Sequence, residues 1–178
     1  MKVALKLLTI LFFVSVTLSS NPVLAKRAAI IIDYDTQEVL FEVNADTLNY
    51  PASLAKIMTL YITFDYLNKN KLSWDDKMKV SETAASRSPS KLYLEKNSSI
   101  SVRDAVMALI VKSANDVATV IAEHIAGTER DFAKLMTKYA KQIGMNKTTF
   151  KNASGLPNRA QLTTARDMAT LSYFLIRN

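Results

Sequence analysis

The pattern of hydrophobic and polar positions changes period once along the chain, from apolar runs typical of strands to spacing typical of helices. The β-prone runs at residues 28–34 and 39–43 flank a polar turn at 33–38, and together they predict a β-hairpin. Tyr50-Pro51-Ala52 then ends the extended region, because proline favours extended geometry before it and the first turn of a helix after it. A short strand within 74–80 and one helical turn at 81–85 are expected further along.

Helical spacing dominates after residue 52. Residues 53–67 predict a helix that is apolar nearly all round, which is typical of a helix buried inside a domain. Ser101, Thr128 and Thr164 each stand three residues before an aspartate and predict the N-caps of three helices, while 116–126 predicts another. The inward positions predicted for the three capped helices are Val102, Val106, Leu109 and Ile110, then Phe132, Leu135, Met136, Tyr139, Ala140 and Ile143, then Met168, Leu171 and Leu175.

The order of these elements, strands first and helices afterwards, indicates an α+β fold in a single domain with no internal repeat and no linker. Two strands alone make a marginal sheet. Helix 53–67 also needs more apolar cover than the rest of the chain clearly supplies. We therefore expect the chain to form part of a larger domain.

Composition and the N-terminal residues indicate an exported protein. The chain has 178 residues, of which 49% are hydrophobic and 22% charged, as expected for one globular domain. Lys2 and Lys6 precede a short apolar run at 7–18 and the small-residue site Val23-Leu24-Ala25, which predicts a signal peptide over 1–25. The run is shorter than the roughly 20 residues of a membrane-spanning helix. We expect the mature chain, 26–178, in the periplasm or on the outer face of the cytoplasmic membrane, without a membrane span.

Charge and residue counts exclude several classes of function. The net charge of +7 falls to +5 without Lys2 and Lys6, and no interleaved aromatic and basic pattern indicates nucleic-acid binding. Lys134, Lys138 and Lys141 lie on the polar side of a predicted helix and are interpreted as a solvated face. The absence of cysteine excludes disulfides and a thiolate nucleophile. His124 is the single histidine and stands at the end of a predicted helix, so neither a zinc cluster nor a Ser-His-Asp triad is expected.

A serine and a lysine three residues apart, Ser53 and Lys56, stand at the start of the apolar helix. This spacing places both side chains on one face of a helix, so the lysine can take the proton of the serine. Burial lowers the pKa of a lysine and frees its amine to act as a base. Backbone N–H groups at a helix start can also stabilise an oxyanion. The pattern indicates a nucleophilic serine activated by lysine.

A second polar motif, Ser113-Ala114-Asn115, interrupts a helical region later in the chain. Ser113 is a candidate for proton transfer to a leaving group, and Asn115 is a candidate for hydrogen bonding to a substrate backbone. The alternative is that both residues only break and recap a helix. Each motif also occurs without this context, as Ser88-Pro-Ser-Lys91 in a polar loop and Ser19-Ser-Asn21 in the predicted signal.

Ser-x-x-Lys followed by Ser-x-Asn is the order found in penicillin-binding proteins and serine β-lactamases. Five segments, at 50–59, 113–116, 122–127, 144–145 and 163–169, resemble the serine D-alanyl-D-alanine carboxypeptidases, which are the low-molecular-mass penicillin-binding proteins of bacteria. The resemblance spans about 28–177. It implies a penicillin-binding/β-lactamase-like transpeptidase fold, present here as a partial catalytic domain over 26–178.

The resemblance also implies a reaction in cell-wall peptidoglycan synthesis, and through it a role in cell shape. Ser53 would attack the carbonyl between the two terminal D-alanines of a peptidoglycan stem peptide while Lys56 accepts its proton. The last D-alanine would leave, and water would hydrolyse the acyl-enzyme. Ser113 would assist proton transfer and Asn115 would hold the peptide. β-Lactams would acylate Ser53 as substrate mimics, and no metal or organic cofactor is implied.

The third motif of the family, Lys-Thr-Gly, is missing from these residues, since Lys147-Thr148-Thr149 lacks the glycine. We therefore expect a chain truncated before that motif, with low or no activity by itself and with a complementing C-terminal chain as a partner. Two alternatives remain open. One is a non-catalytic peptidoglycan-binding module or inert gene fragment. The other is a serine β-lactamase, which would need a water-activating carboxylate that the sequence does not place.

Overall fold

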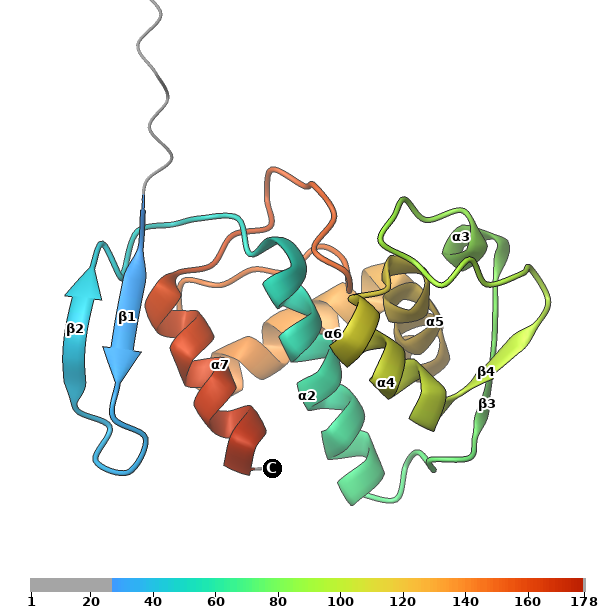
Figure 1. The fold of residues 1–178 in the computed structure, drawn as a ribbon, viewed down its shortest axis with the longest axis horizontal. Coiled ribbons are helices and arrows are strands. Elements are labelled where there is room, and N and C mark those ends of the chain that lie inside the picture. The colour runs from blue at the N-terminus through green and yellow to red at the C-terminus, as the bar shows by residue number, and fades with distance from the viewer. Residues whose placement is uncertain (1–26, 178) are drawn as a thin grey trace, which may run out of the picture.

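The computed structural model of the chain describes residues 27–177, and the predicted signal peptide lies outside them. A β-hairpin lies at one flank and helices make up most of the remainder (Figure 1), which confirms the α+β prediction. The elements in chain order are β1 (Ala29–Ile32), β2 (Val39–Val43), the 3-10 turn η1 (Ala52–Leu54), α2 (Ala55–Asn68), β3 (Lys77–Lys79), α3 (Glu82–Ala85), β4 (Ser99–Ser101), α4 (Val102–Lys112), α5 (Asn115–Ala126), α6 (Glu129–Gln142) and α7 (Ala165–Arg177).

The predicted hairpin is confirmed as an antiparallel pair of β1 and β2. Its turn is held by Asp33, whose backbone N–H donates to the Glu38 carbonyl at 2.9 Å. One face of the hairpin lies against α7, where Arg166 pairs with Glu42. On β1 and β2, Ile31 and Phe41 stand opposite each other and remain 55% and 51% exposed. The sheet therefore keeps an apolar face open to solvent within the described chain.

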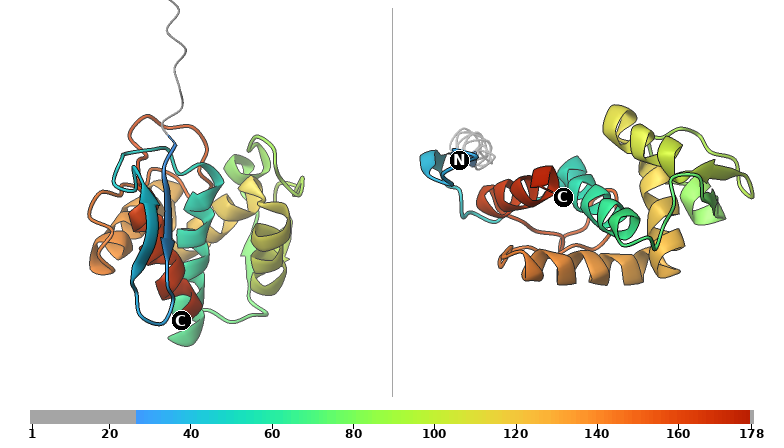
Figure 2. Two further views of the ribbon diagram at one scale, coloured as in Figure 1. Left: turned by 60° about the vertical axis from the view of Figure 1, so that its left-hand side comes forward. Right: turned by 90° about the horizontal axis from the view of Figure 1, so that it is seen from below.

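Helix α2 occupies the middle of the helical layer, as predicted for a helix that is apolar nearly all round. It packs against α4, α5, α6 and α7. Figure 2 shows α6 passing beneath α7 and α2, with α4 and α5 on the far side from the hairpin. The largest fully buried apolar side chains come from these helices, from β3 (Lys77–Lys79) and from the segment after α6: Met58, Ile62, Met78, Ile121, Phe132, Met136, Met145, Phe150 and Leu171.

The three predicted N-caps are present. The hydroxyl oxygens of Ser101 and Thr128 each accept a hydrogen bond from the backbone N–H three residues later, at 3.1 and 3.0 Å, and Thr164 does the same at 3.0 Å. One predicted inward position is wrong, because Ile110 is 58% exposed. Successive residues of a helix are about 100° apart, so Ile110 lies well round the helix from Leu109, outside the stripe that faces the core.

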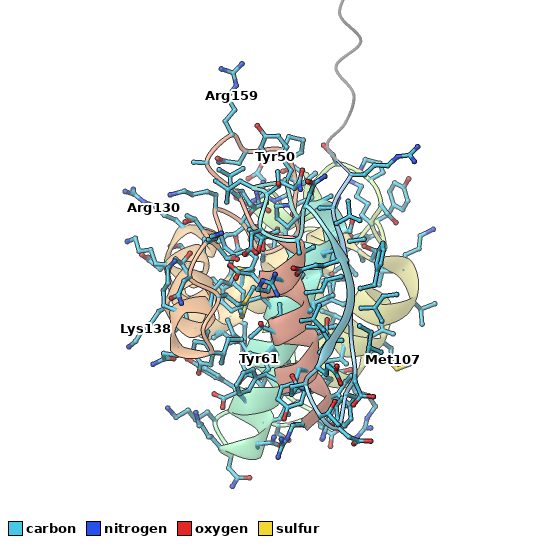
Figure 3. All side chains as sticks on the ribbon, turned by 90° about the vertical axis from the view of Figure 1, so that its left-hand side faces the viewer. Tyr50, Tyr61, Met107, Arg130, Lys138 and Arg159 are labelled. Carbon is cyan, nitrogen blue, oxygen red and sulfur yellow. The ribbon has the colours of Figure 1, made fainter. Side chains whose placement is uncertain are left out.

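A second small sheet was only half predicted. The short strand expected within 74–80 is β3, and it pairs with β4, for which no strand was predicted. The three residues Ser99, Ile100 and Ser101 are too few, and too polar, to show a strand period. The cationic side chains of α6 behave as expected for a solvated face: Arg130 and Lys138 both extend away from the helix layer (Figure 3).

None of the helices formed by residues 27–177 combines the length and the apolar character needed to cross a bilayer.

The loop between α3 and β4 is fixed to the start of α5 by a buried carboxylate. Asp116 is fully buried, and the backbone N–H groups of Leu92 and Leu94 each donate to it at 3.1 Å. Its own helix contributes the N–H of Val117 at 2.9 Å. Because these donors are backbone groups, the carboxylate fixes the path of the loop whatever side chains the loop carries.

We predict that Asp116→Ala lowers the free energy of unfolding by at least about 3 kcal/mol, because it leaves three backbone donors without their acceptor. The matched control is Asp75→Ala, an exposed aspartate, with an expected change within about 0.5 kcal/mol. Denaturant titrations of both variants measure the difference. Equal effects of the two substitutions would contradict the role assigned to Asp116.

Candidate active site

Ser53 lies in the 3-10 turn η1, immediately before α2, and its side chain is exposed. The α-helix thus begins at Ala55, two residues later than the sequence pattern predicted. In 3-10 geometry residues i and i+3 are eclipsed, so the turn keeps Ser53 and Lys56 on the same side. The residue before the serine, Ala52, has a φ of 47°. A non-glycine residue in this left-handed region stores local strain, a feature often found at active sites.

The backbone of a distant loop lies directly on this turn. Gly155 has a φ of +86°, and a Cβ atom added to it would lie 1.7 Å from the carbonyl oxygen of Ala52. The loop holds this shape through Asn152, which accepts the N–H of Gly155 at 2.7 Å and donates to the carbonyl of Leu156 at 2.9 Å. Glycine is therefore required at 155, both for its φ and for the close approach.

Lys56 is buried on α2, with only 4% of its surface exposed. Its Nζ donates to the backbone carbonyl of Ser154 at 2.6 Å, and Thr59, on the next turn of the helix, donates to the carbonyl of Ala153 at 2.8 Å. No carboxylate of residues 27–177 pairs with the amine. Burial without a counter-charge lowers the pKa of Lys56 from 10.5 to about 8. This is the environment expected for a lysine that acts as a base.

The two members of the first motif do not hydrogen-bond each other in the structure. Among the described residues, Lys56 donates to the Ser154 carbonyl, and the hydroxyl of Ser53 has no hydrogen-bond partner. Catalytic hydrogen bonds are often long or misaligned before substrate binds. The burial of the amine agrees with the predicted chemistry, and the roles of the two residues stay predictions.

Ser113 stands between α4 and α5 in a left-handed conformation, with φ 56° and ψ 41°. The residue that caps α5 is Ala114, and no side chain accepts a capping hydrogen bond there. Ser113 is itself the C-cap of α4, so its backbone breaks the helix as the alternative interpretation states, while its hydroxyl caps neither helix. Among residues 27–177 this hydroxyl has no hydrogen-bond partner, and it is half-buried.

Asn115 is the first residue of α5 and holds the neighbouring loop. Its Nδ2 donates to the carbonyl of Ser88 at 2.9 Å, and its backbone N–H donates to the carbonyl of Ser90 at 2.7 Å. Its Oδ1 accepts no hydrogen bond from the described residues, so the amide oxygen is the atom available to a ligand. The competing Ser-x-x-Lys sequence ends in this same loop, where Lys91 donates to the carbonyl of Ala85 at 3.0 Å. It has no helix to place its lysine over its serine.

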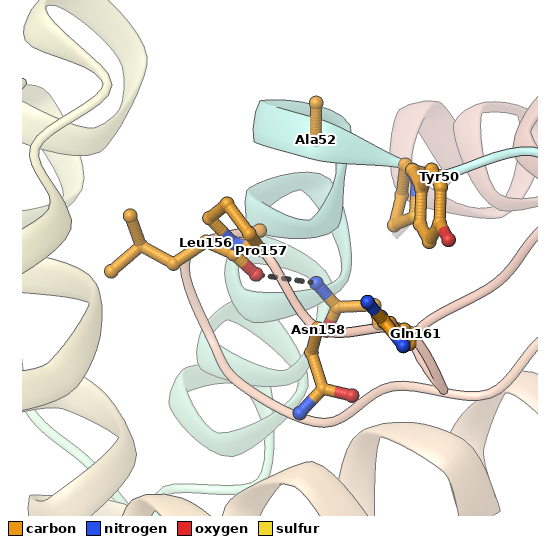
Figure 4. Close-up of a pocket in the computed structure, with 9 residues that line it drawn as sticks. Tyr50, Ala52, Leu156, Pro157, Asn158 and Gln161 are labelled. Atoms are coloured by element: carbon orange, nitrogen blue, oxygen red, sulfur yellow. Dashed lines mark hydrogen bonds between the residues drawn. The ribbon is translucent and has the colours of Figure 1, made fainter.

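A pocket of about 310 Å³ adjoins the serine turn. Figure 4 shows Tyr50 and Ala52 on one side of it and Pro157, Asn158 and Gln161 on the other. Ser53 and Lys56 are not among its lining residues. The pocket is largely apolar and places the loop 155–161 beside the predicted nucleophile. Gly155 and Pro157 are the sequence signals for a loop here, and nothing local indicates that it lies beside Ser53.

Groups of three or more histidine, cysteine or acidic side chains that could hold a metal ion do not occur within the described part of the chain. His124 is exposed near the end of α5.

Residues 15–178 match the model of a protein family, peptidase S11, described as D-alanyl-D-alanine carboxypeptidase. The chain belongs to this family. Among curated members, it is 36% identical over 151 residues to the D-alanyl-D-alanine carboxypeptidase DacF of Bacillus subtilis, covering 85% of this chain and 39% of DacF. It is 38% identical over 163 residues to DacC of Escherichia coli, covering 88% of this chain and 41% of DacC.

Solved structures of the family share this fold. The D-alanyl-D-alanine carboxypeptidase DacD of Francisella tularensis superposes with a TM-score of 0.84 at 44% identity, over 87% of this chain and 38% of that one. Penicillin-binding protein D2 of Listeria monocytogenes, solved in its ampicillin-bound form, gives a TM-score of 0.76 at 35% identity, over 88% of this chain and 64% of that one. The predicted penicillin-binding fold is therefore confirmed for the part of it present here. The chain spans about 40% of the length of its curated relatives.

We predict that Gly155→Ala lowers the free energy of unfolding by at least about 3 kcal/mol, since it adds a clash with Ala52 to the strain of a left-handed alanine. The matched control in the same chain is Gly144→Ala. Gly144 has a φ of +91° but no atom within 4 Å of an added Cβ. Strain alone costs about 1–2 kcal/mol there. Denaturant titrations compare the variants, and equal losses would argue against the close approach.

The buried amine also predicts a pH dependence of stability. The pKa of Lys56 is about 8 in the folded state and 10.5 in the unfolded state, so the folded state binds fewer protons between these values. The free energy of unfolding therefore rises with pH in this window, whereas below it both states are protonated and the burial penalty is complete. We expect the difference in unfolding free energy between the wild type and Lys56→Met to grow in favour of the wild type from about pH 7.5 to 9.5. A difference in unfolding free energy that stays constant over this pH range would contradict the burial of the Lys56 amine.

Proposed function

We propose that this chain carries the nucleophile, the base and the second motif of a serine-type D-alanyl-D-alanine carboxypeptidase acting on peptidoglycan stem peptides. The observation that carries the proposal is the position of an exposed serine at a strained turn, one helical turn before a buried lysine. The pKa of that lysine is about 8. Family membership supplies the substrate class. The predicted signal peptide supports export to the periplasm or the outer face of the cytoplasmic membrane.

In this proposal Lys56, in its neutral form, takes the proton of Ser53 as the serine oxygen attacks the carbonyl carbon of the penultimate D-alanine. The C–N bond to the last D-alanine breaks, and a proton is delivered to its amine through Ser113. Water then hydrolyses the acyl-serine ester. Asn115 holds the peptide through the amide oxygen left free by its bond to Ser88.

β-Lactams are proposed to acylate the same serine. A relative of similar fold, penicillin-binding protein D2 of Listeria monocytogenes, has been solved with ampicillin and with cefotaxime bound. A strained cyclic amide that opens on attack would leave Ser53 acylated, because the departing nitrogen stays tethered to the acyl group. Labelling by penicillin therefore reports the nucleophile without the need for a peptide substrate.

A complementing C-terminal segment is also proposed, and the hairpin supports it. Two strands are fewer than an independently stable sheet needs, and Ile31 and Phe41 leave an apolar face exposed. The resemblance to the family implies a Lys-Thr-Gly strand beside the site, and the described residues contain no such motif. Removing one stabilising group from an oxyanion site costs on the order of 10²–10³ in rate. We therefore propose that this polypeptide alone acylates slowly.

We predict that a fluorescent penicillin labels the chain slowly, that the label maps to Ser53, and that Ser53→Ala abolishes it. The matched control is Ser88→Ala, the serine of the competing Ser-x-x-Lys sequence, which should leave labelling unchanged. The labelling rate should rise with pH and level off above about pH 8, where Lys56 is neutral. Gel fluorescence measures the labelling rate at each pH, and peptide mass spectrometry identifies the labelled residue. Labelling that survives Ser53→Ala would refute the proposal.

Measurements of turnover and of peptidoglycan binding distinguish the remaining alternatives. A carboxypeptidase releases D-alanine from a peptide ending in D-alanyl-D-alanine, whereas a serine β-lactamase hydrolyses penicillin with repeated turnover. A non-catalytic module would retain peptidoglycan binding in the Ser53→Ala variant and show no labelling in the wild type.

A further inference from the structure

The first residue of α6, Glu129, connects segments from three parts of the chain although it touches neither motif through its side chain. Its carboxylate is 11% exposed and pairs with Arg87. Its Oε1 accepts the backbone N–H of Ala153 at 3.1 Å and lies 3.4 Å from the hydroxyl of Thr119. A half-buried carboxylate with a guanidinium on one oxygen and a backbone donor on the other has little freedom to move.

On one side, this carboxylate fixes the peptide that holds the lysine. The N–H of Ala153 points to Glu129, while the carbonyl of Ala153 accepts the hydroxyl of Thr59 and the next carbonyl, of Ser154, accepts the amine of Lys56. Residues 153–154 therefore lie between α6 and α2, with hydrogen bonds to both helices. If the bond to Glu129 were lost, the acceptor of Lys56 would be anchored from the α2 side only.

On the other side, the same carboxylate is connected to the second motif. Arg87 donates through Nε to the hydroxyl of Thr119 at 2.9 Å, and that hydroxyl lies 3.3 Å from the backbone carbonyl of Asn115. Arg87 also immediately precedes Ser88, whose carbonyl accepts the amide of Asn115. The Arg87–Glu129 pair thus contacts α5 and leads directly into the loop that Asn115 holds.

We propose that Glu129, with Arg87, is a positioning residue that fixes the loop holding Lys56 relative to the helix that begins with Asn115. This inference rests on the proposed function for its catalytic meaning, because it concerns the relative placement of the first and second motifs. Independently of catalysis, residues 153–154 move away from Lys56 when Glu129 is removed, and water reaches the amine.

The chemistry of the pair determines which substitutions are informative. Glu129→Gln keeps an oxygen that accepts the N–H of Ala153 and loses the charge opposite Arg87. Glu129→Asp keeps the charge and withdraws the carboxylate by one methylene group. Glu129→Ala removes both interactions. The matched control is Asp65→Ala, which removes another half-buried carboxylate, 16% exposed, that joins α2 to α6 through Tyr139.

The test is the pKa of Lys56, read in the full chain from the ¹³Cε signal of labelled lysine as pH is raised, with the signal assigned from Lys56→Arg. The lowered pKa comes from burial, so admission of water raises it towards 10.5. We expect the pKa to rise by at least about half a unit in Glu129→Ala and Glu129→Asp, and to stay near the wild-type value in Glu129→Gln and Asp65→Ala. A purely structural role would lower stability in the Glu129 and Asp65 variants alike and leave the lysine titration unmoved.

Penicillin labelling of the same samples separates this inference from the proposed function. We expect at least a tenfold slower labelling in Glu129→Ala and an intermediate slowing, of about three- to tenfold, in Glu129→Gln, which keeps the acceptor for Ala153 and loses the ion pair with Arg87. If the wild type is not labelled at all while the lysine titration shifts as expected, the proposed function fails and the positioning role holds. If the titration of Lys56 is the same in wild type, Glu129→Asp and Glu129→Ala, the positioning role is overturned. Should Glu129→Ala not fold, Glu129→Asp decides.

Discussion

The hydrogen bond from the amine of Lys56 to the backbone carbonyl of Ser154 is the interaction on which the rest of the site depends. A lysine that is almost fully buried needs an acceptor, and no carboxylate of the described chain supplies one. The acceptor comes instead from a loop 98 residues away in sequence. Bringing that loop to α2 places its backbone against the turn of Ser53, which only a glycine at 155 permits. Burial lowers the pKa of Lys56, and the loop that supplies the acceptor of its amine also packs closely against the turn of Ser53.

The polar groups that surround the two motifs are hydrogen-bonded within the protein, whereas the hydroxyls of the two candidate serines are not. Asn115 and Asp116 hold the loop after α3, and Glu129 holds the loop after α6. Within residues 27–177 the hydroxyls of Ser53 and Ser113 have no partner. Such a division is typical of a preorganised site, in which the supporting polar groups are satisfied internally and the reacting groups remain available to a ligand.

The sequence predicted those features that depend on neighbouring residues. The hairpin, the buried central helix, the three capped helices and the Ser53–Lys56 spacing all follow from local period or local hydrogen bonding. It did not predict that Ser154 is the partner of Lys56, because backbone carbonyls are the same in every residue and leave no pattern. Ile110 was misplaced for a different reason: hydrophobicity places a residue on a helix, but the width of the buried stripe is set by the neighbouring elements. The strand β4 was not predicted because three residues are too few to show a hydrophobic period, and its extended conformation depends on pairing with β3.

Ser113 keeps a left-handed backbone conformation that glycine adopts more readily. Selection for heat resistance alone would therefore favour glycine at this position, since the exchange relieves strain and breaks no hydrogen bond among the described residues. A thermostabilised descendant of this chain would then gain melting temperature at the expense of the hydroxyl. Engineering campaigns that score variants only by thermal shift would record such a change as an improvement while removing the hydroxyl to which the proposed function assigns a proton transfer.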